Sequence, residues 1–272
     1  MQRREFLAAS GAAAAAAVSV TASSPALLAA GAPTDKHLIE LRTYRCASPQ
    51  KRQAFEQFVG EAMIPALGRA GVGPVGAFKL LAADNAALKL TDDSNDLYVL
   101  VPHRTSESFV TLERRLAADE AYRSAGRAVL GAAKSDPAYA RYETSLMVGF
   151  DHCPQVQAPS KAASRVLQLR VYESHSDERA KRKVHMFNEG GEISIFRRVG
   201  MNPVFFGETL AGPKMPNLTY MLAFDDEAAM TDAWDAFRGD AEWKRLSGDE
   251  SYKDTVSNIT NLVLRPVAGS QI

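Results

Sequence analysis

The chain has 272 residues, and its 32 basic and 32 acidic side chains give a formal net charge of zero at pH 7. A neutral surface does not concentrate nucleic acid or anionic membrane, so we expect no nucleic-acid partner. The cysteines, Cys46 and Cys153, are too few for a disulfide framework, and we expect them to stay unpaired.

The first 32 residues have the order of a twin-arginine export signal. Arg3 and Arg4 precede an apolar run from Ala8 to Val20, and small residues follow it. The run is too short and too rich in alanine for a spanning helix, which needs about 20 strongly apolar residues. We therefore expect residues 1–32 to be removed. The mature protein is then expected in the periplasm, or otherwise outside the cytoplasm, with no membrane span.

The strand that follows the signal has two different faces. Ile39 and Leu41 lie on one face, and Glu40, Arg42 and Tyr44 lie on the other. A serine and a proline then begin a helix, and a cluster of glycines marks its end. The expected elements are a strand at 38–45, a helix from 48, a strand at 76–82, a loop at 84–95, a strand at 97–101, a helix from 106 and a strand at 142–150.

The same pattern returns later in the chain, so two copies of one module are predicted. The segment Glu40–Tyr44 recurs as Gln168–Tyr172, at a spacing of 172 − 44 = 128 residues. A period this long indicates a duplicated domain, because solenoid repeats run to about 20–50 residues. We predict modules at 37–150 and 165–267, each in the order β-α-β-β-α-β, joined by a linker at 151–164.

The second copy can be aligned with the first in detail. A spacing of 121 residues places Met230 on Phe109 and Phe237 on Leu116 in the second helix of each module. The second module is therefore shorter by seven residues between its first strand and its second helix. Its expected elements are strands at 166–173, 204–208, 218–224 and 259–265, with helices from 176 and 226.

These segments resemble the NIPSNAP family. The resemblance rests on the two opening strands, on Pro65 late in the first helix, and on Phe237–Trp243, while Met186–Phe196 and Asn202–Glu208 are similar to exported bacterial members. The first module departs at Asp119–Tyr122, where a tryptophan form is typical. The resemblance implies an α+β fold of tandem ferredoxin-like repeats, of the dimeric α/β-barrel type, with antiparallel sheets and helices on one face. The family has no established reaction, and a homo-oligomer is left open.

The polar face of each opening strand carries the sharpest chemical signal. In the implied fold one sheet face meets the helices and the other meets a second sheet, so we expect the polar face between the sheets. An unpaired charge there would cost on the order of several kcal/mol. The side chains therefore form an internal ion-pair network, or they line a cavity for a small organic anion, which arginine can bind through two oxygens. The predicted ligand-binding residues are Arg42, Tyr44, Arg170 and Tyr172.

The two copies differ beside the arginine. Glu40 can supply a carboxylate for Arg42, whereas Gln168 stands in the same place beside Arg170. Arg170 is therefore the better candidate for an external anion. Replacing Arg42 should mainly destabilise the fold, because it leaves Glu40 unpaired.

The remaining polar residues form less specific patterns. The histidines make no HxH, HxxH or HxxxH pair, and we expect no metal site. His185 is a candidate haem ligand for a barrel fold, although the basic run Lys181–Lys183 beside it indicates a solvated helix. Glu189 and Glu192 flank two glycines, so they would act as an acid and a base or hold a cation, unless the glycines only interrupt a helix.

Two classes of function stay open from the sequence. No phosphate-binding glycine loop, nucleophile with a base, or catalytic triad order is present, which favours a protein that binds a small organic ligand. The alternative is an oxidoreductase of the monooxygenase or haem-dependent type, by analogy with enzymes on the same barrel, and this leaves haem open as a cofactor.

Overall fold

The computed structural model describes residues 36–272. The predicted export signal, with Arg3 and Arg4, lies outside the described residues. Among residues 36–272, no helix is both long enough and apolar enough to cross a membrane.

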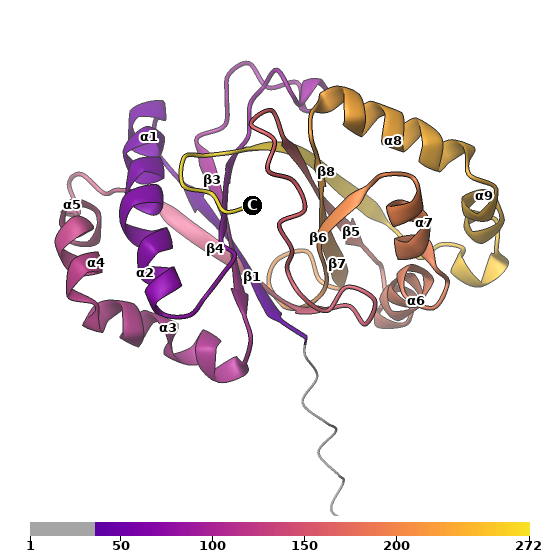
Figure 1. Ribbon diagram of the computed structural model, residues 1–272, viewed down its shortest axis with the longest axis horizontal. Helices are drawn as coiled ribbons and strands as arrows, with labels where there is room; N and C mark the ends of the chain where they lie inside the picture. The colour runs from indigo at the N-terminus through magenta and orange to yellow at the C-terminus, as the bar shows by residue number, and fades with distance from the viewer. Residues whose placement is uncertain (1–35) are drawn as a thin grey trace, which may run out of the picture. The chain divides into compact units, whose positions relative to one another are not determined.

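Within the described part, eight β-strands form the centre of the structure (Figure 1). The strand predicted at 166–173 has its expected bounds, whereas the strand expected at 76–82 is shorter and the one at 204–208 is longer. Strand ends depend on pairing with neighbours, which a single sequence does not show. The strands are Leu38–Arg45 (β1), Gly76–Lys79 (β2), Asp96–His103 (β3), Arg141–Gly149 (β4), Val166–Glu173 (β5), Asn202–Ala211 (β6), Asn217–Phe224 (β7) and Asn258–Pro266 (β8).

The helices lie outside the strands in two groups, α1 to α5 from the first half and α6 to α9 from the second (Figure 1). They are Pro49–Phe58 (α1), Ile64–Arg69 (α2), Ser106–Ala118 (α3), Glu120–Ala125 (α4), Arg127–Leu130 (α5), Asp177–Phe187 (α6), Glu192–Arg198 (α7), Glu227–Gly239 (α8) and Ala241–Ser247 (α9). A π-helical turn, Val59–Met63 (η1), joins α1 to α2, and 3-10 turns occur at Ala86–Leu88 (η2) and Glu250–Tyr252 (η3).

Side-chain caps begin the main helices where the sequence predicts them. Ser48 accepts a hydrogen bond from the Lys51 amide at the start of α1, and Ser176 accepts one from the Arg179 amide at the start of α6. The two serines are 128 residues apart, like the strands before them. Thr105 and Asp226 cap α3 and α8, and these two helices keep a constant offset of 121 residues from end to end.

The strands close into one antiparallel barrel with the order β1-β3-β2-β8-β5-β7-β6-β4. Each half supplies four neighbouring strands, β4-β1-β3-β2 and β8-β5-β7-β6. Two seams join the halves: β4 pairs with β6, and β2 pairs with β8 through Phe78 with Pro266 and Lys79 with Arg265. A closed barrel has no open sheet edge, so every strand has two partners.

The interior of the barrel is filled with apolar side chains from both halves. Ile39 and Leu41 of β1 meet Leu167 and Leu169 of β5 in this cluster, and Phe205 of β6 is fully buried there. The segment 151–164 also contributes, because Val156 belongs to the same cluster. Residues 36–272 thus form one compact unit with a shared core.

The prediction that the polar face of each opening strand lies between the sheets is wrong. Arg42 reaches Glu113 of α3, and the Tyr44 ring packs 4.6 Å from the Phe55 ring of α1, so the polar face meets the helices and not the other sheet. The same holds for β5, whose Arg170 lies over Trp234 of α8. The physical reason is that both faces of these strands are buried. Alternation shows that the faces differ but does not show which one is inside.

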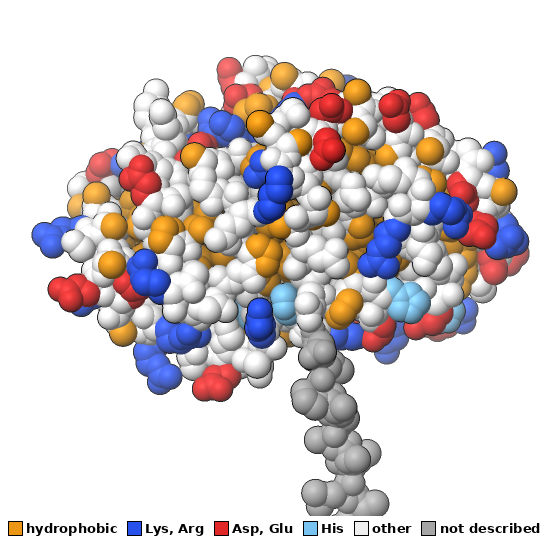
Figure 2. Space-filling model, viewed as in Figure 1, with side chains coloured by type: hydrophobic (Ala, Val, Ile, Leu, Met, Phe, Trp, Pro, Cys, Tyr) orange, Lys and Arg blue, Asp and Glu red, His pale blue; other side chains and the backbone are white. Residues whose placement is uncertain are grey.

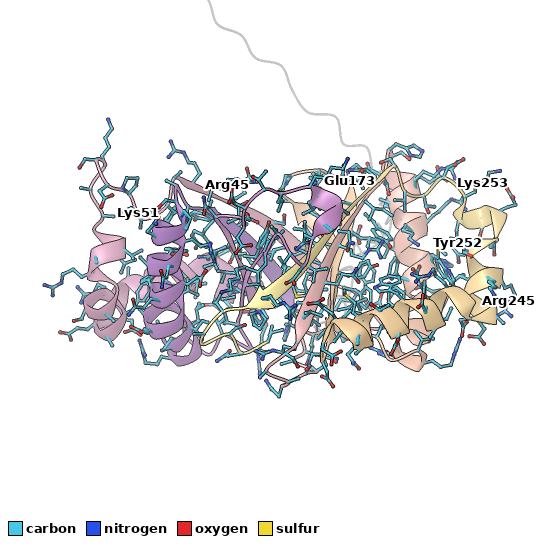
Figure 3. All side chains as sticks on the ribbon, turned by 90° about the horizontal axis from the view of Figure 1, so that it is seen from above. Arg45, Lys51, Glu173, Arg245, Tyr252 and Lys253 are labelled. Atoms are coloured by element: carbon cyan, nitrogen blue, oxygen red, sulfur yellow. The ribbon has the colours of Figure 1, made fainter. Side chains whose placement is uncertain are left out.

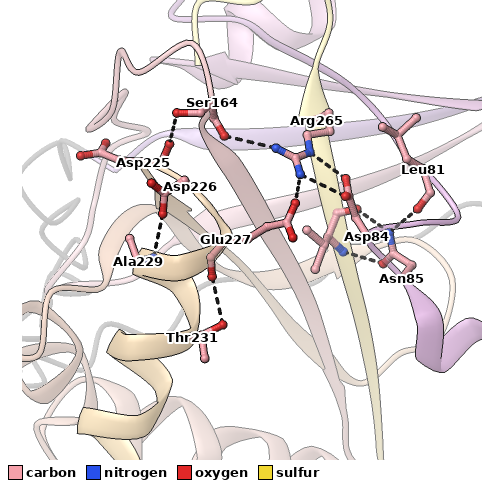
Figure 4. A network of polar contacts seen from close by, with 11 residues as sticks. Leu81, Asp84, Asn85, Ser164, Asp225, Asp226, Glu227, Ala229, Thr231 and Arg265 are labelled. Atoms are coloured by element: carbon pink, nitrogen blue, oxygen red, sulfur yellow. Dashed lines mark hydrogen bonds and ion pairs between the residues drawn. The ribbon is translucent and has the colours of Figure 1, made fainter.

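A polar network fastens the β2–β8 seam (Figure 4). Arg265 of β8 donates to both carboxylate oxygens of Asp84, at 2.7 and 3.0 Å, and also contacts Glu227 of α8. Asn85 exchanges two hydrogen bonds of 2.8 Å with the backbone of Val263. The segment predicted as a loop at 84–95 thus holds the two halves together through Asp84 and Asn85.

The two cysteines are free and buried in different helix-covered clusters, Cys46 in the first half and Cys153 in the second. On the face shown in Figure 2, acidic and basic side chains are interspersed, as expected for a chain with no net charge. No group of three or more His, Cys, Asp or Glu side chains among residues 36–272 is placed to hold a metal ion.

Candidate functional site

A cavity of about 650 Å³ lies between the outer face of the second-half sheet and its helices. Strands β5 and β8 form its floor, and α6, α7, α8 and α9 contribute its walls. We call it the β5 pocket. Its lining residues are Gln168, Arg170, Tyr172, Lys183, Glu192, Met230, Thr231, Trp234, Phe237, Arg238, Trp243, Val256, Ile259 and Asn261.

Arg170 is the cation in the floor of the β5 pocket. Its guanidinium carbon lies 4.7 Å from the ring centroid of Trp234 and 5.2 Å from that of Tyr172. Its buried Nε has no hydrogen-bond partner, and no carboxylate within residues 36–272 forms an ion pair with it. Arginine cannot lose its charge in a protein, so this group requires an anion or water from outside the fold.

The neighbour of Arg170 on the strand is already satisfied. Gln168 accepts a hydrogen bond of 2.7 Å from the Trp234 indole and donates one of 2.9 Å to Asn261. Both ends of its amide are therefore occupied, and it fixes the indole of Trp234 against the strand. This leaves Gln168 unable to turn toward Arg170 without breaking these bonds.

A buried ion pair forms another wall of the pocket. Lys183 of α6 donates to Glu192 of α7 over 2.9 Å, and the two side chains are 6% and 2% exposed. The Lys183 ammonium also lies 4.7 Å from the Phe187 ring centroid and 5.5 Å from that of Tyr172. Burial raises the pKa of Glu192, and the nearby Lys183 only partly offsets this rise.

Tyr172 links these charges to the core. Its hydroxyl accepts a hydrogen bond of 3.0 Å from the hydroxyl of the fully buried Tyr220. Burial raises the pKa of both phenols, so both stay protonated at neutral pH. The ring of Tyr172 is thus anchored beside both Arg170 and Lys183.

The equivalent place in the first half is an ion-pair network. Arg42 donates to both oxygens of Glu40, at 2.7 and 3.0 Å, and to Glu113 of α3 at 3.0 Å. Glu40 also contacts His103 at 3.3 Å and accepts a bond of 3.0 Å from Thr144. Burial alone would raise the pKa of Glu40, but the hydrogen bonds from His103, Arg42 and Thr144 lower it to about 2.

Aromatic rings fill the space that is open in the second half. Tyr44 stacks on Tyr142 at 5.0 Å and meets Tyr139 edge to face at 5.1 Å. An offset of 117 residues between β4 and β8 puts Val256 and Ile259 in these places, and both are smaller. Only about 150 Å³ remains around Arg42, so the first half retains little room for a ligand.

The structure separates the four predicted ligand-binding residues into two groups. Arg170 and Tyr172 line the β5 pocket, whereas Arg42 and Tyr44 belong to the satisfied network of the first half. The predicted pairing of Arg42 with Glu40 is confirmed. The cavity lies outside the barrel and not between its sheets, because the interior is filled.

The structure also places the charged residues and glycines singled out between residues 181 and 192. Lys183 is buried, so the basic run at 181–183 is not wholly solvated as predicted, and its pairing with Glu192 could not be seen from spacing alone. Glu189 is exposed. Gly191 adopts a left-handed φ of 88° between α6 and α7, which supports the structural interpretation of the two glycines.

The sequence interpretation missed Trp234 as a partner of Arg170. The signal was present, because Trp234 aligns with Glu113 at the offset of 121 residues that the two helices share. The change from glutamate to tryptophan accompanies the change from Glu40 to Gln168. Both carboxylates that hold Arg42 are therefore absent around Arg170.

Comparisons with known proteins agree with this fold. Residues 167–271 match the NIPSNAP family. Two solved structures of candidate monooxygenases are similar at 11% identity: one from Fusobacterium nucleatum (TM-score 0.56, 85% of this chain and 93% of that chain) and one from Lactobacillus acidophilus (TM-score 0.53, 86% and 97%). An uncharacterized NIPSNAP-like domain protein from Burkholderia xenovorans matches at 16% identity over 39% of this chain and 88% of its own, with a TM-score of 0.36. No sequence among curated proteins matches the chain. At these identities the structural likeness shows the fold alone.

Proposed function

We propose that the β5 pocket, which lies within the residues 167–271 that match the NIPSNAP family, binds a small organic anion. The observation that carries the proposal is that Arg170, in the pocket floor, forms no ion pair with a carboxylate of residues 36–272 and that its buried Nε has no hydrogen-bond partner. A carboxylate would supply the two oxygens that its planar fork can bind.

The walls of the pocket indicate what kind of carbon skeleton carries the anionic group of the ligand. Trp234, Phe237 and Trp243 present aromatic rings, and Met230 and Ile259 add aliphatic surface. Such walls suit a flat or aromatic carbon skeleton joined to the anionic group. We therefore propose an aromatic or similarly apolar carboxylate as the ligand class.

Intrinsic fluorescence provides a direct test, because the chain has two tryptophans and both line the pocket. Titration with benzoate should change the emission and reach saturation, while benzamide, which has the same shape without the charge, should have little effect. Arg170→Met should abolish the response to benzoate.

Arg245→Met serves as the matched control, since Arg245 is an exposed arginine of α9 outside the pocket lining (Figure 3). This variant should bind benzoate as the unmodified protein does. An equal response to benzoate and benzamide, or undiminished binding by Arg170→Met, would contradict the proposal.

An oxidoreductase remains the second candidate, supported by the two candidate monooxygenases that share the fold. No histidine or cysteine is among the lining residues of the pocket, so a haem group there would lack its commonest axial ligands. His185 lies outside the lining, and its Nδ1 is 2.9 Å from the hydroxyl of Tyr252, at the edge of the second half (Figure 3). Oxygen consumption in the presence of an aromatic carboxylate that binds the pocket would favour this second candidate.

The barrel also suggests how the chain arose. Each half has the order β-α-β-β-α-β once its short additional helices are set aside, and the strand orders of the two halves correspond. We propose that the halves are tandem ferredoxin-like modules produced by duplication, with the first kept for structure and the second for binding.

The N-terminal sequence supports export by the twin-arginine route as a separate proposal. The double change Arg3→Lys with Arg4→Lys keeps the charge but removes the paired arginines, so the precursor should accumulate in the cytoplasm. Immunoblots of cytoplasmic and periplasmic fractions would measure this. Normal processing of the double variant would refute the export proposal and leave the binding proposal untouched.

A further inference from the structure

We propose that Lys183 forms an imine with a small oxo acid whose carboxylate is bound by Arg170. This inference rests on the proposed function, because it assigns the same pocket a carbonyl-bearing ligand and a covalent step. Its basis is the buried pair Lys183–Glu192, which the first half of the chain does not have.

The internal comparison shows that this pair is not needed to build the fold. At the offset of 128 residues that relates α1 to α6, Lys183 aligns with Phe55 and Glu192 aligns with Ile64. Phe55 and Ile64 are buried in the apolar cluster of the first half. Replacing a buried ion pair by apolar residues is often neutral or stabilising, so a fold that needed only packing would have no use for the charges.

The placement of the charges suits a ligand with two functional groups. Arg170 and Lys183 approach the same ring, with charge-bearing atoms 5.2 and 5.5 Å from the Tyr172 centroid, and both line the pocket. Because both cations line one pocket beside the same ring, a single small molecule can present its carboxylate to Arg170 and its oxo group to Lys183. Tyr172 is fixed by its bond to Tyr220, so the spacing is preorganised.

Glu192 provides the proton transfer that the reaction needs. The carboxylate takes a proton from the Lys183 ammonium over the 2.9 Å hydrogen bond, and the raised pKa of Glu192 favours this transfer. The neutral amine then adds to the carbonyl carbon, and the oxygen becomes the hydroxyl of a carbinolamine. Loss of that hydroxyl with the proton from Glu192 releases one water and leaves the C=N bond, so the step needs no oxidant or reductant.

Borohydride trapping tests the covalent step. Phenylpyruvate serves as the probe, and 3-phenylpropanoate, which has the carboxylate but no oxo group, serves as its control. With phenylpyruvate and borohydride, the intact mass should rise by about one reduced adduct per chain, and peptide mapping should place it on Lys183. The control acid should give no adduct, although it should compete with the probe.

Two variants separate chemistry from folding. Lys183→Arg keeps the positive charge beside Glu192 but cannot form an imine. The double variant Lys183→Phe with Glu192→Ile reproduces the apolar pair of the first half. Both should keep the far-ultraviolet circular dichroism spectrum of the folded chain and lose the adduct by roughly tenfold or more relative to the unmodified chain.

The outcomes distinguish this inference from the proposed function. Phenylpyruvate that changes the tryptophan emission but leaves no adduct on Lys183 would overturn the imine and leave anion binding intact. An undiminished adduct in Lys183→Arg would also overturn it. Absence of any response to phenylpyruvate and benzoate would overturn both.

Discussion

Arg42 and Arg170 occupy the same place in β1 and β5, yet of these two arginines only Arg42 forms ion pairs with carboxylates of residues 36–272. The difference follows from two substitutions, glutamate to Gln168 on the strand and glutamate to Trp234 on the helix. Removing two carboxylates while keeping the cation stabilises neither half by itself. An external anion that binds Arg170 would explain why the second half keeps the arginine without the two carboxylates.

This contrast predicts opposite effects of the same substitution. Arg42→Met leaves the buried Glu40 without its main partner, so the free energy of unfolding should fall by about 3 kcal/mol. Arg170→Met leaves no protein carboxylate unpaired, and its unfolding free energy should stay within about 1 kcal/mol of the unmodified value. Urea denaturation followed by circular dichroism would measure both. Equal destabilisation by the two variants would mean that Arg170 is also purely structural.

Glu40 should dominate part of the acid dependence of stability. Its pKa is lowered from 4.5 to about 2 by hydrogen bonds, so its contribution is complete above pH 4.5 and is lost as the pH falls toward 2. The contribution should amount to about 3 kcal/mol. In Glu40→Gln, the unfolding free energy should fall less steeply over this pH window, which urea titrations at a series of pH values would detect. Parallel pH profiles for the two proteins would argue against this assignment.

For these individual residues, the sequence predicted which side chains on one strand pair with each other, but not which face of the strand meets the helices. The pair Arg42–Glu40 and the isolation of Arg170 follow from residues two apart on one strand face. The contacts with Glu113, Trp234 and Lys183 come from helices, and their geometry depends on how each helix lies on the sheet. A single sequence does not contain that information.

The second helix of each half determines whether the arginine of the opening strand is paired with a protein carboxylate. Helices α3 and α8 have the same length and the same offset, and Glu113 and Trp234 occupy equivalent positions on them. In α3 the side chain reaches the arginine as a carboxylate, and in α8 it covers the arginine as an aromatic ring. Helix placement is thus conserved within the chain while its chemistry changes.

Trp234→Glu should therefore give Arg170 a protein carboxylate as a partner and block the binding of an external anion. The new carboxylate should pair with Arg170 as Glu113 pairs with Arg42, and the affinity for benzoate should fall by about tenfold or more. Trp234→Phe is the matched control, because it keeps an aromatic cover without a charge. Isothermal titration calorimetry would measure both variants. Benzoate affinity that falls equally in both would show that the indole, and not the free charge, determines binding.

Elements were predictable where a cap or an alternation marks them. Ser48, Ser176 and Asp226 identify three helix starts, and the period of two identifies the opening strands. Helix α7 was not predicted, since Gly190 and Gly191 read as an interruption. The glycines permit a turn with a left-handed residue, after which a helix begins again.

The whole molecule depends on two seams of unequal length. Strands β4 and β6 pair over four residue positions with a bulge, whereas β2 and β8 pair over only two. The β2–β8 seam is supplemented by Asp84 with Arg265 and by Asn85 with Val263 (Figure 4). These contacts link residues far apart in sequence, so composition and periodicity could predict two modules but not how they are fastened.

Asn85 should therefore matter for the stability of the entire barrel. Its side chain is 6% exposed, and it accepts from the Val263 amide and donates to the carbonyls of Val263 and Leu81. Asn85→Ala leaves these buried backbone groups without partners, so the unfolding free energy should fall by about 3 kcal/mol. Because both halves share one interior core, the loss should appear as a shift of a single transition.

The control for this prediction is an asparagine of the second half. Asn258 is exposed and donates to Glu173 at the surface, so Asn258→Ala should change the unfolding free energy by no more than about 0.5 kcal/mol. Thermal and urea denaturation, followed by tryptophan fluorescence and by circular dichroism, would report the second half and the whole chain separately. Since both tryptophans lie in the second half, two separate transitions in Asn85→Ala would show that the halves unfold independently and that the seam does not couple them.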